Sequence, residues 1–460
     1  MTMNKKIKYQ SAIIASKLVH RTLKLFGRNS THMPGHIALK IDPELLKTLP
    51  MPQHRLAITG TNGKTSVSNL ISAFLRYKQF DVINNSYGSN ILQGTTTALL
   101  SGTNILGNQT KPWSVLEVDE LASRFLLPDY QPQHLIVTNL FRDSYRRNAH
   151  VDFIVTRLNQ AIGDNTHLLL NGDDLISSML KPNNARSYFS IRPLPHETSN
   201  SDALINDLPI CPQCNHPLTY TFQHYHHIGK ATCSNCHFSN PKPDYEIIDR
   251  NPKTFILKYQ EELYEFPSFS DNLTDLYNAL ATIASLHLAG FTFPEIQEGF
   301  PKLQLPTTRY EETIVANKRF VTIMGKDQNP VAVTRAFDYI RRQTNQGNIG
   351  IFMANPPNKR GVLETENIAY LYDVNFEYLN QPFIKRVGFA SARYLDYMAR
   401  LEFAGYPKNQ ILGKPLEEEL LDVFNIDDLN TIYLIPGTKN LPLMHQVKQS
   451  LIQKAKEAST

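Results

Sequence analysis

Apolar residues in the first 300 or so positions form short continuous runs, separated by longer segments with helical spacing. The runs lie at residues 55–60, 114–117, 135–139 and 167–171. A strand that is apolar at consecutive positions is typical of a parallel sheet covered by helices on both faces. Intervening segments such as residues 66–79 repeat apolar positions with the period of a helix. The pattern predicts an α/β fold with a mostly parallel sheet.

A second α/β pattern begins after Pro306. Apolar runs at residues 319–325, 348–355 and 431–437 predict strands, and residues 330–343 predict a helix. A chain of 460 residues is too long for one ordinary core. We therefore predict three parts, which are an N-terminal segment 1–48, a central domain 49–305 and a C-terminal Rossmann-like α/β domain 306–460.

The N-terminal segment is basic. Residues 1–30 contain seven lysine and arginine residues and no acidic residue, and their apolar positions are spaced loosely as in a helix. One interpretation is a surface helix packed on the protein body. The other is a basic amphipathic helix that contacts anionic lipid. We find no apolar run of membrane-spanning length and no signal-peptide core, so we expect a cytoplasmic protein, with possible peripheral contact at the inner face of the membrane.

Residues 56–66 read LAITGTNGKTS and contain the shorter core of a phosphate-binding loop. Its residues are Gly60, Thr61, Asn62, Gly63, Lys64 and Thr65. Glycines let backbone N–H groups surround phosphate oxygens, and the following helix directs its positive end at the same place. Lys64 would reach the β- and γ-phosphates, and the Thr65 hydroxyl would hold Mg²⁺. The alternative is a chance glycine turn with an exposed lysine.

A metal ligand is expected on a neighbouring strand. Glu117 ends the apolar run of residues 114–117, and Asp119 and Glu120 follow it. We predict that the Glu117 carboxylate holds Mg²⁺ together with Thr65, because Mg²⁺ prefers oxygen ligands. The alternative is a solvated acidic loop end.

The four cysteines of the chain form two C-x-x-C pairs separated by 18 residues. The residues are Cys211, Cys214, Cys233 and Cys236. This spacing is a strong signature of a structural zinc site, because four thiolates close a tetrahedron and leave no position for water. We predict a zinc ribbon over residues 209–244, with the three histidines at 224, 226 and 227 on its surface. The alternative is four free buried thiols.

The glycine loop is similar to the nucleotide loop of the Mur ligase family, whose members activate a carboxylate as an acyl phosphate and couple it to an amine. Further segments agree with the family at residues 84–99, 117–120, 137–143, 276–286 and 307–312. The resemblance implies ATP and Mg²⁺ as cofactors and Lys64 and Glu117 as catalytic residues. It also implies that Asn278 and Arg309 contact the nucleotide, Asn278 lying near the adenine.

One branch of the family carries a four-cysteine ribbon in the central domain and lacks the N-terminal UDP-binding domain. Residues 34–46, 233–245, 370–377 and 392–405 resemble this branch. Its members are the ligase-like subunits of enzymes that amidate D-glutamate of the lipid II stem peptide to D-isoglutamine. The resemblance implies a GatD-like glutamine amidotransferase as partner, which releases ammonia, and an aspartate, here Asp373, that orients the partner's catalytic histidine.

The chain departs from this branch mainly at residues 144–153 and 354–367, which allows a different partner or acceptor. For Asp373 itself, the alternative is an aspartate at a strand end that caps a loop. A second reading of the whole chain is an amino-acid ligase of the Mur or folylpolyglutamate type that works without a glutaminase. A third is a nucleic-acid-binding protein, but the ribbon segment has only two lysines, which is too little charge for that role, so we expect no nucleic-acid partner.

Overall fold

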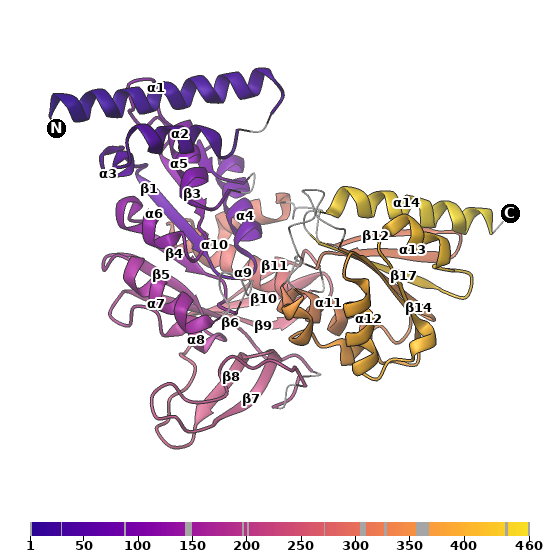
Figure 1. Cartoon of the computed structure of the whole chain (residues 1–460). Coiled ribbons are helices and arrows are strands. Elements are labelled where there is room, and N and C mark those ends of the chain that lie inside the picture. The colour runs from indigo at the N-terminus through magenta and orange to yellow at the C-terminus, as the bar shows by residue number, and fades with distance from the viewer. Residues whose placement is uncertain are drawn as a thin grey trace. The chain divides into compact units, whose positions relative to one another are not determined.

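The structure is a computed structural model of the whole chain, shown in Figure 1. It describes residues 2–28, 30–86, 89–142, 150–195, 197–199, 202–270, 272–303, 310–325, 329–355, 368–437 and 440–458. The chain divides into two compact units. Unit 1 contains Met1–Phe141, His150–Ser201 and Asp207–Leu305, and unit 2 contains Arg142–Ala149, Asp202–Asn206 and Pro306–Thr460.

Unit 1 is built around a sheet in which the described residues form nine strands, in the order β11-β10-β9-β6-β5-β4-β1-β3-β2. The strands are β1 His54–Thr59, β2 Val82–Asn84, β3 Trp113–Glu117, β4 His134–Val137, β5 His167–Asn171, β6 Arg186–Ile191, β9 Tyr245–Arg250, β10 Thr254–Tyr259 and β11 Glu262–Pro267. The seven strands from β9 to β2 in this order pair in parallel, and β10 and β11 extend the sheet as an antiparallel edge. The α/β fold with a mostly parallel sheet is therefore confirmed.

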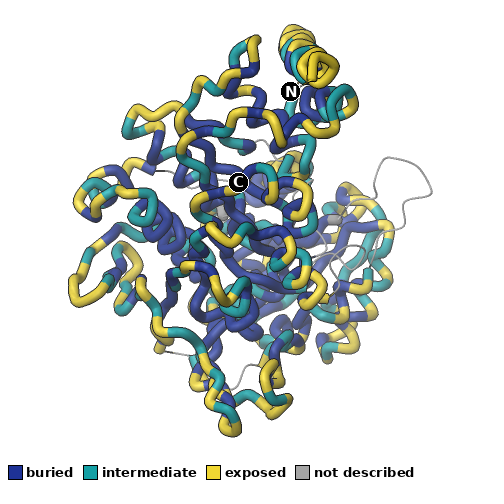
Figure 2. The backbone as a smooth tube through the Cα atoms, turned by 90° about the vertical axis from the view of Figure 1, so that its left-hand side faces the viewer, coloured by how far each residue is buried: buried dark blue, intermediate teal, exposed yellow. Residues whose placement is uncertain are grey.

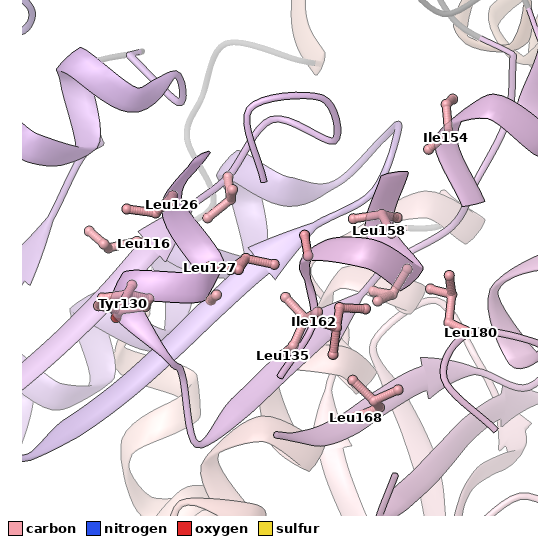
Figure 3. Packing of buried hydrophobic residues seen from close by; sticks show 14 of the residues in the cluster. Leu116, Leu126, Leu127, Tyr130, Leu135, Ile154, Leu158, Ile162, Leu168 and Leu180 are labelled. Atoms are coloured by element: carbon pink, nitrogen blue, oxygen red, sulfur yellow. The ribbon is translucent and has the colours of Figure 1, made fainter. Parts of the chain in front are cut away.

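The helices of unit 1 cover both faces of this sheet or pack on the helices that do. They are α1 Met3–Leu25, α2 Met33–Ile41, α3 Leu45–Thr48, α4 Lys64–Tyr77, α5 Leu92–Ser101, α6 Ser123–Tyr130, α7 Val151–Ala161, α8 Leu175–Ser178, α9 Leu273–Leu288 and α10 Phe293–Gly299, with a 3₁₀ turn η1 Phe300–Lys302. Figure 3 shows Leu126 and Leu158 of α6 and α7 packed with Leu135 and Leu168 of the sheet. This burial explains the continuous apolar runs, since β3 is buried at every position.

The ribbon is a separate antiparallel pair, β7 Leu218–Tyr225 and β8 Ile228–Cys233, inserted between β6 and β9. The cysteines lie at one end of this hairpin and the turn at Tyr225–Ile228 lies at the other. His226 takes a positive φ of 49° in that turn. The cysteine end of the hairpin therefore holds the four sulfur atoms, and the turn at the opposite end contacts the rest of unit 1.

Unit 2 contains a second sheet, whose described strands follow the order β12-β13-β17-β14-β15-β16. The strands are β12 Tyr310–Val315, β13 Lys318–Ile323, β14 Ile349–Asn355, β15 Ile384–Ser391, β16 Ile411–Lys414 and β17 Thr431–Pro436. Only the β12–β13 pair is antiparallel among these. The helices are α11 Pro330–Arg341, α12 Tyr394–Phe403, α13 Glu417–Val423 and α14 Leu441–Glu457, with 3₁₀ turns η2 Ala369–Tyr372, η3 Phe376–Leu379 and η4 Lys408–Gln410.

The second sheet has a hydrophobic core on each face. One core contains residues of α11 and α12, and the other contains residues of α13 and α14. A parallel sheet covered on both sides in this way is the architecture expected from the apolar runs of the C-terminal part. Within the described parts of both units, no helix combines the length and apolarity needed to cross a bilayer.

Candidate nucleotide site and metal centre

The glycine loop joins β1 to α4 and is shaped by two glycines. Gly60 and Gly63 have φ values of 123° and 93°, which favour glycine over any other residue. A Cβ atom on Gly60 would lie 2.4 Å from Thr138 Oγ1, and one on Gly63 would lie 2.4 Å from Asn278 Oδ1. The loop therefore needs glycine both for its backbone conformation and for its close approach to the end of β4 and to α9.

Two loop residues are fixed by the segment that follows β4. The backbone N–H of Thr61 donates to Asn139 O at 2.8 Å, and that of Asn62 donates to Asn139 Oδ1 at 3.0 Å. The Thr61 hydroxyl accepts from Phe141 N at 2.9 Å. These contacts hold the loop's shape. The N–H groups that open α4, those of Lys64 and Thr65, have no acceptor within the helix and are the ones available to an anion.

Lys64 is buried, which contradicts the alternative of an exposed lysine in a chance turn. Its ammonium lies 3.0 Å from Glu120 Oε1, with side-chain exposures of 8% and 2%, and it also donates to Gly60 O. Burial alone would lower the pKa of Lys64, but the carboxylates of Glu120 and Glu117 outweigh it, so the pKa lies above its usual value. A fixed, fully charged cation at the start of the helix is suited to binding phosphate.

Thr65 and Glu117 meet beside this lysine. The Thr65 hydroxyl donates to Glu117 Oε2 at 2.8 Å, and Asn90 Nδ2 donates to Glu117 Oε1 at 2.9 Å. Glu117 is 7% exposed, so it is not a solvated loop end. A hydroxyl and a carboxylate in contact supply the oxygen ligands that Mg²⁺ prefers. Asn90 and Glu120 were not among the predicted site residues, although both lie in segments that resemble the Mur ligase family.

Asn278 of α9 faces the glycine loop. Its side chain is 2% exposed, and its Nδ2 atom is buried with no hydrogen-bond acceptor among the described residues. A buried donor without a partner is costly unless a ligand satisfies it, which fits a nucleotide at this place. Arg309, the other predicted nucleotide contact, lies outside the described residues. Its neighbour Glu311 forms an ion pair with Lys448 at 3.1 Å.

Asp373 belongs to unit 2, where it directly follows the 3₁₀ turn η2 and does not end a strand. The interpretation as a strand-end aspartate is therefore wrong. Its Oδ2 atom lies 3.7 Å from Arg142 Nη1 and has no hydrogen-bond partner among the described residues. Burial raises the pKa of Asp373, and the Arg142 guanidinium opposes this shift. The carboxylate is thus held near a cation while one oxygen keeps its hydrogen-bonding capacity.

The four cysteine sulfurs converge at the base of the ribbon. Cys211 and Cys236 are 3.5 Å apart, Cys214 and Cys233 are 3.4 Å apart, and all four sulfurs lie within 4.8 Å of one another. A tetrahedral zinc ion with Zn–S bonds of about 2.3 Å has sulfur atoms about 3.8 Å apart. The donor set and its spacing therefore fit a closed, structural metal site.

The ribbon histidines are not on the surface, so that prediction is wrong. His226 and His227 are each 1% exposed and His224 is 8% exposed. For His224 and His227 the reason is that acidic residues from distant segments contact them. His224 Nδ1 bonds Glu197 Oε1 at 2.8 Å, and His227 Nε2 lies 3.3 Å from Asp174 Oδ1. Buried polar rings are tolerated when they are paired in this way.

The ribbon turn contacts Phe141, a residue that supports the glycine loop. The ring of Phe141 lies 4.5 Å from the ring of His227, measured between centroids, and the Phe141 backbone is hydrogen bonded to the Thr61 hydroxyl. Leu140 N donates to Asp174 Oδ2 at 2.8 Å, so the same aspartate contacts both the ribbon and the segment after β4. The ribbon turn is therefore part of the support beneath the loop.

Comparison with known proteins gives one family and several relatives. Residues 327–438 match the family described as MurT ligase C-terminal. The chain is 28% identical over 444 residues to the lipid II isoglutaminyl synthase (glutamine-hydrolyzing) subunit MurT of Staphylococcus aureus strain COL, covering 96% of this chain and 98% of that protein. It is 26% identical to the MurT subunit of Streptococcus pneumoniae R6, with coverage of 93% and 94%.

Solved structures give the same fold. A pseudomurein peptide ligase type C from Methanothermus fervidus aligns with a TM-score of 0.67 at 18% identity, covering 89% of this chain and 81% of that one. MurF ligase from Thermotoga maritima, solved in complex with ADP, aligns with a TM-score of 0.59 at 12% identity, covering 92% and 85%. The chain therefore has a Mur-ligase-like fold, and over nearly its whole length its sequence is similar to the MurT subunits of lipid II isoglutaminyl synthase.

Proposed function

We propose that this chain is the ATP-dependent ligase subunit of a lipid II isoglutaminyl synthase. In this proposal it transfers the terminal phosphoryl group of ATP to the α-carboxylate of D-glutamate in the stem peptide. Ammonia then displaces phosphate, which gives D-isoglutamine. The observation that carries the proposal is the cluster that buried Lys64 and Glu117 form with the partly buried Thr65 at the glycine loop, in a chain that aligns over nearly its whole length with proteins of that name.

Each residue of the cluster has a chemical task in this reaction. The Lys64 ammonium would exchange its contact with Glu120 for the β- and γ-phosphate oxygens, and would stabilise charge that develops during transfer. Thr65 and Glu117 would hold Mg²⁺, which neutralises phosphate charge when bound. The Asn278 amide would donate its unpaired hydrogen to the nucleotide. Arg309 is proposed as a further nucleotide contact on the family resemblance alone.

Zinc is proposed for the four-cysteine cluster, where it would have no part in the reaction. All four ligand positions are taken by sulfur, so no site remains for a reacting water or carboxylate. The ion would hold the base of the ribbon, and the ribbon turn would in turn support Phe141 and the glycine loop. The metal is therefore structural in this proposal.

Ammonia would come from a glutamine amidotransferase subunit of the GatD type. Asp373 is the residue proposed to orient that partner's catalytic histidine. A carboxylate beside a histidine fixes its tautomer and stabilises its protonated form. The position suits this role, because the Asp373 side chain is still 21% exposed while Arg142 favours its ionised form. Because lipid II is membrane-borne, we place the reaction in the cytoplasm at the inner face of the membrane.

The test is an amidation assay with lipid II, ATP and either glutamine or added ammonia, using the chain together with its co-encoded amidotransferase. Asp373→Asn should abolish glutamine-dependent amidation and spare the reaction with added ammonia. Asp422→Asn, an exposed aspartate of unit 2, is the matched control and should leave both reactions unchanged.

Two outcomes would contradict the proposal. If an amino acid is ligated to the carboxylate in place of ammonia, the chain is an amino-acid ligase that works without a glutaminase. If Asp373→Asn lowers both reactions equally, Asp373 belongs to the ligase site or supports the fold, and its proposed role toward the partner is wrong.

A further inference from the structure

Helix α1 is fixed to unit 1 by one of its faces. Its buried residues are Ala12, Ile13 and Ser16, and it lies over α2 and α5 (Figure 1). The Tyr9 hydroxyl donates to Gly107 O at 3.1 Å, and Lys17 Nζ donates to Leu100 O at 2.8 Å. The interpretation of this segment as a surface helix packed on the protein body therefore describes one face of the helix.

The opposite face carries a stripe of large apolar side chains in solvent. They are Met3 (82% exposed), Ile7 (57%), Ile14 (47%), Leu18 (60%) and Leu25 (86%). At about 100° per residue, these five positions fall within an arc of about 60°. Figure 2 shows α1 at the top of the view with many exposed residues. Apolar residues scattered singly on a surface are ordinary, but an aligned stripe marks an interaction site.

The apolar surface continues beyond the helix. Phe26, directly after α1, is 76% exposed, and Ile105 and Leu106 are each 63% exposed. The loop that contains Ile105 and Leu106 lies against α1, because Gln10 Nε2 donates to Ile105 O at 2.5 Å. Helix and loop together therefore present more apolar area than the stripe alone.

Positive charge borders the stripe. Lys6 and Lys24 lie about 90° to one side of its centre, and Lys8 lies about 110° to the other. All three are exposed, and the chain has no acidic residue before Asp42. An apolar stripe between cationic side chains is the pattern of a helix that lies in the plane of an anionic bilayer, with its apolar side at the acyl boundary and its lysines at the phosphates.

We propose that the exposed face of α1 docks the protein onto an anionic lipid bilayer. The charge pattern argues against a second copy of this chain as the occupant, because two such faces would bring like charges together. The biological purpose of this docking rests on the proposed function. A protein held at the membrane surface would reach a substrate that is attached to a lipid carrier. The helix would lie on the bilayer and would not cross it.

The experiment is co-sedimentation of the full chain with vesicles of phosphatidylcholine, either pure or mixed with phosphatidylglycerol. The test variant is Ile14→Gln/Leu18→Gln/Leu25→Gln, which keeps residues that favour a helix. We expect the wild type to bind the anionic vesicles. The triple variant should bind them at least about tenfold more weakly. A matched control replaces three apolar residues exposed elsewhere in unit 1, Phe125, Phe153 and Leu263, by glutamine. The control should bind like the wild type.

Lys6→Gln/Lys24→Gln should weaken binding to the anionic vesicles, and added salt should do the same. Amidation of a lipid-free stem-peptide substrate should be unchanged in the triple variant. If the wild type does not amidate this substrate, the proposed function is wrong, but the result of the vesicle experiment still holds. The docking proposal is overturned if the wild type ignores anionic vesicles, if the triple variant binds as well as the control, or if light scattering shows that the stripe joins two copies of the chain.

Discussion

The ion pair between Lys64 and Glu120 yields a prediction that separates folding from nucleotide binding. The two charged groups are 3.0 Å apart, with side-chain exposures of 8% and 2%. Lys64→Met removes the cation and leaves the carboxylate of Glu120 buried. Removing one partner of a buried pair costs about 3–5 kcal/mol, because the remaining charge is uncompensated. We therefore expect Lys64→Met to lower the free energy of unfolding by about 3–5 kcal/mol.

A second substitution should restore most of this stability. In Lys64→Met/Glu120→Gln the buried carboxylate becomes a neutral amide, so the main cause of the loss is removed. Nucleotide binding should be absent from both variants, because both lack the ammonium. Lys408→Met breaks an exposed lysine–glutamate pair in unit 2 and is the control. It should lower stability by less than about 1 kcal/mol.

Urea unfolding followed by tryptophan fluorescence measures the effect. Trp113 is the only tryptophan of the chain and lies on β3, so its signal reports on unit 1. A buried carboxylate that has lost its cation is less costly once it is protonated, so the deficit of Lys64→Met should shrink as the pH is lowered toward the range where carboxyl groups take up protons. The reasoning is refuted if Lys64→Met is as stable as the wild type, or if the double variant recovers nothing.

Three further predictions concern other parts of the site. Cys211→Ser should lower the bound zinc measured by a colorimetric assay and should make residues 209–244 more sensitive to protease, whereas unchanged zinc content would contradict the four-sulfur site. Arg142→Gln should raise the pKa of Asp373 further, because it removes the cation that opposes the effect of burial. The acid limb of glutamine-dependent amidation should then move to higher pH while ammonia-dependent amidation keeps its profile, and equal shifts in both would speak against the role of Asp373. Asn278→Leu should leave the stability of the free chain unchanged or slightly higher, because it removes a buried donor without an acceptor in the described residues. In calorimetry it should weaken ATP binding about 10- to 100-fold, and undiminished affinity would exclude Asn278 from the nucleotide site.

Local patterns explain why much of the fold could be predicted from the sequence. The central strands are buried on both faces, so their residues are continuously apolar, as β3 and β4 illustrate. The glycine loop was recognisable because phosphate binding requires certain residue types at fixed spacing, and the same holds for the cysteine pairs. The antiparallel edge formed by β10 and β11 was not predicted, since these strands are only partly buried and lack such a run.

What sequence reasoning missed depends on contacts between distant segments. The ribbon histidines were assigned to the surface because the four cysteines already fill the coordination shell of a metal ion. Glu197 and Asp174, 27 and 53 positions away from His224 and His227 respectively, allow these two histidines to be buried. Glu120 was passed over because Glu117 already satisfied the expected pattern. In the fold, Glu117 bonds the Thr65 hydroxyl and Glu120 pairs with Lys64. Only the fold separates these roles.

The central claim is that ATP phosphorylates a carboxylate at the glycine loop. The most direct measurement uses a lipid II substrate whose D-glutamate α-carboxyl group is labelled with oxygen-18, turned over with ATP and ammonia. The account predicts that one labelled oxygen passes from the carboxyl group to the released inorganic phosphate. Formation of D-isoglutamine with unlabelled phosphate, the lost labelled oxygen appearing in water, would contradict it.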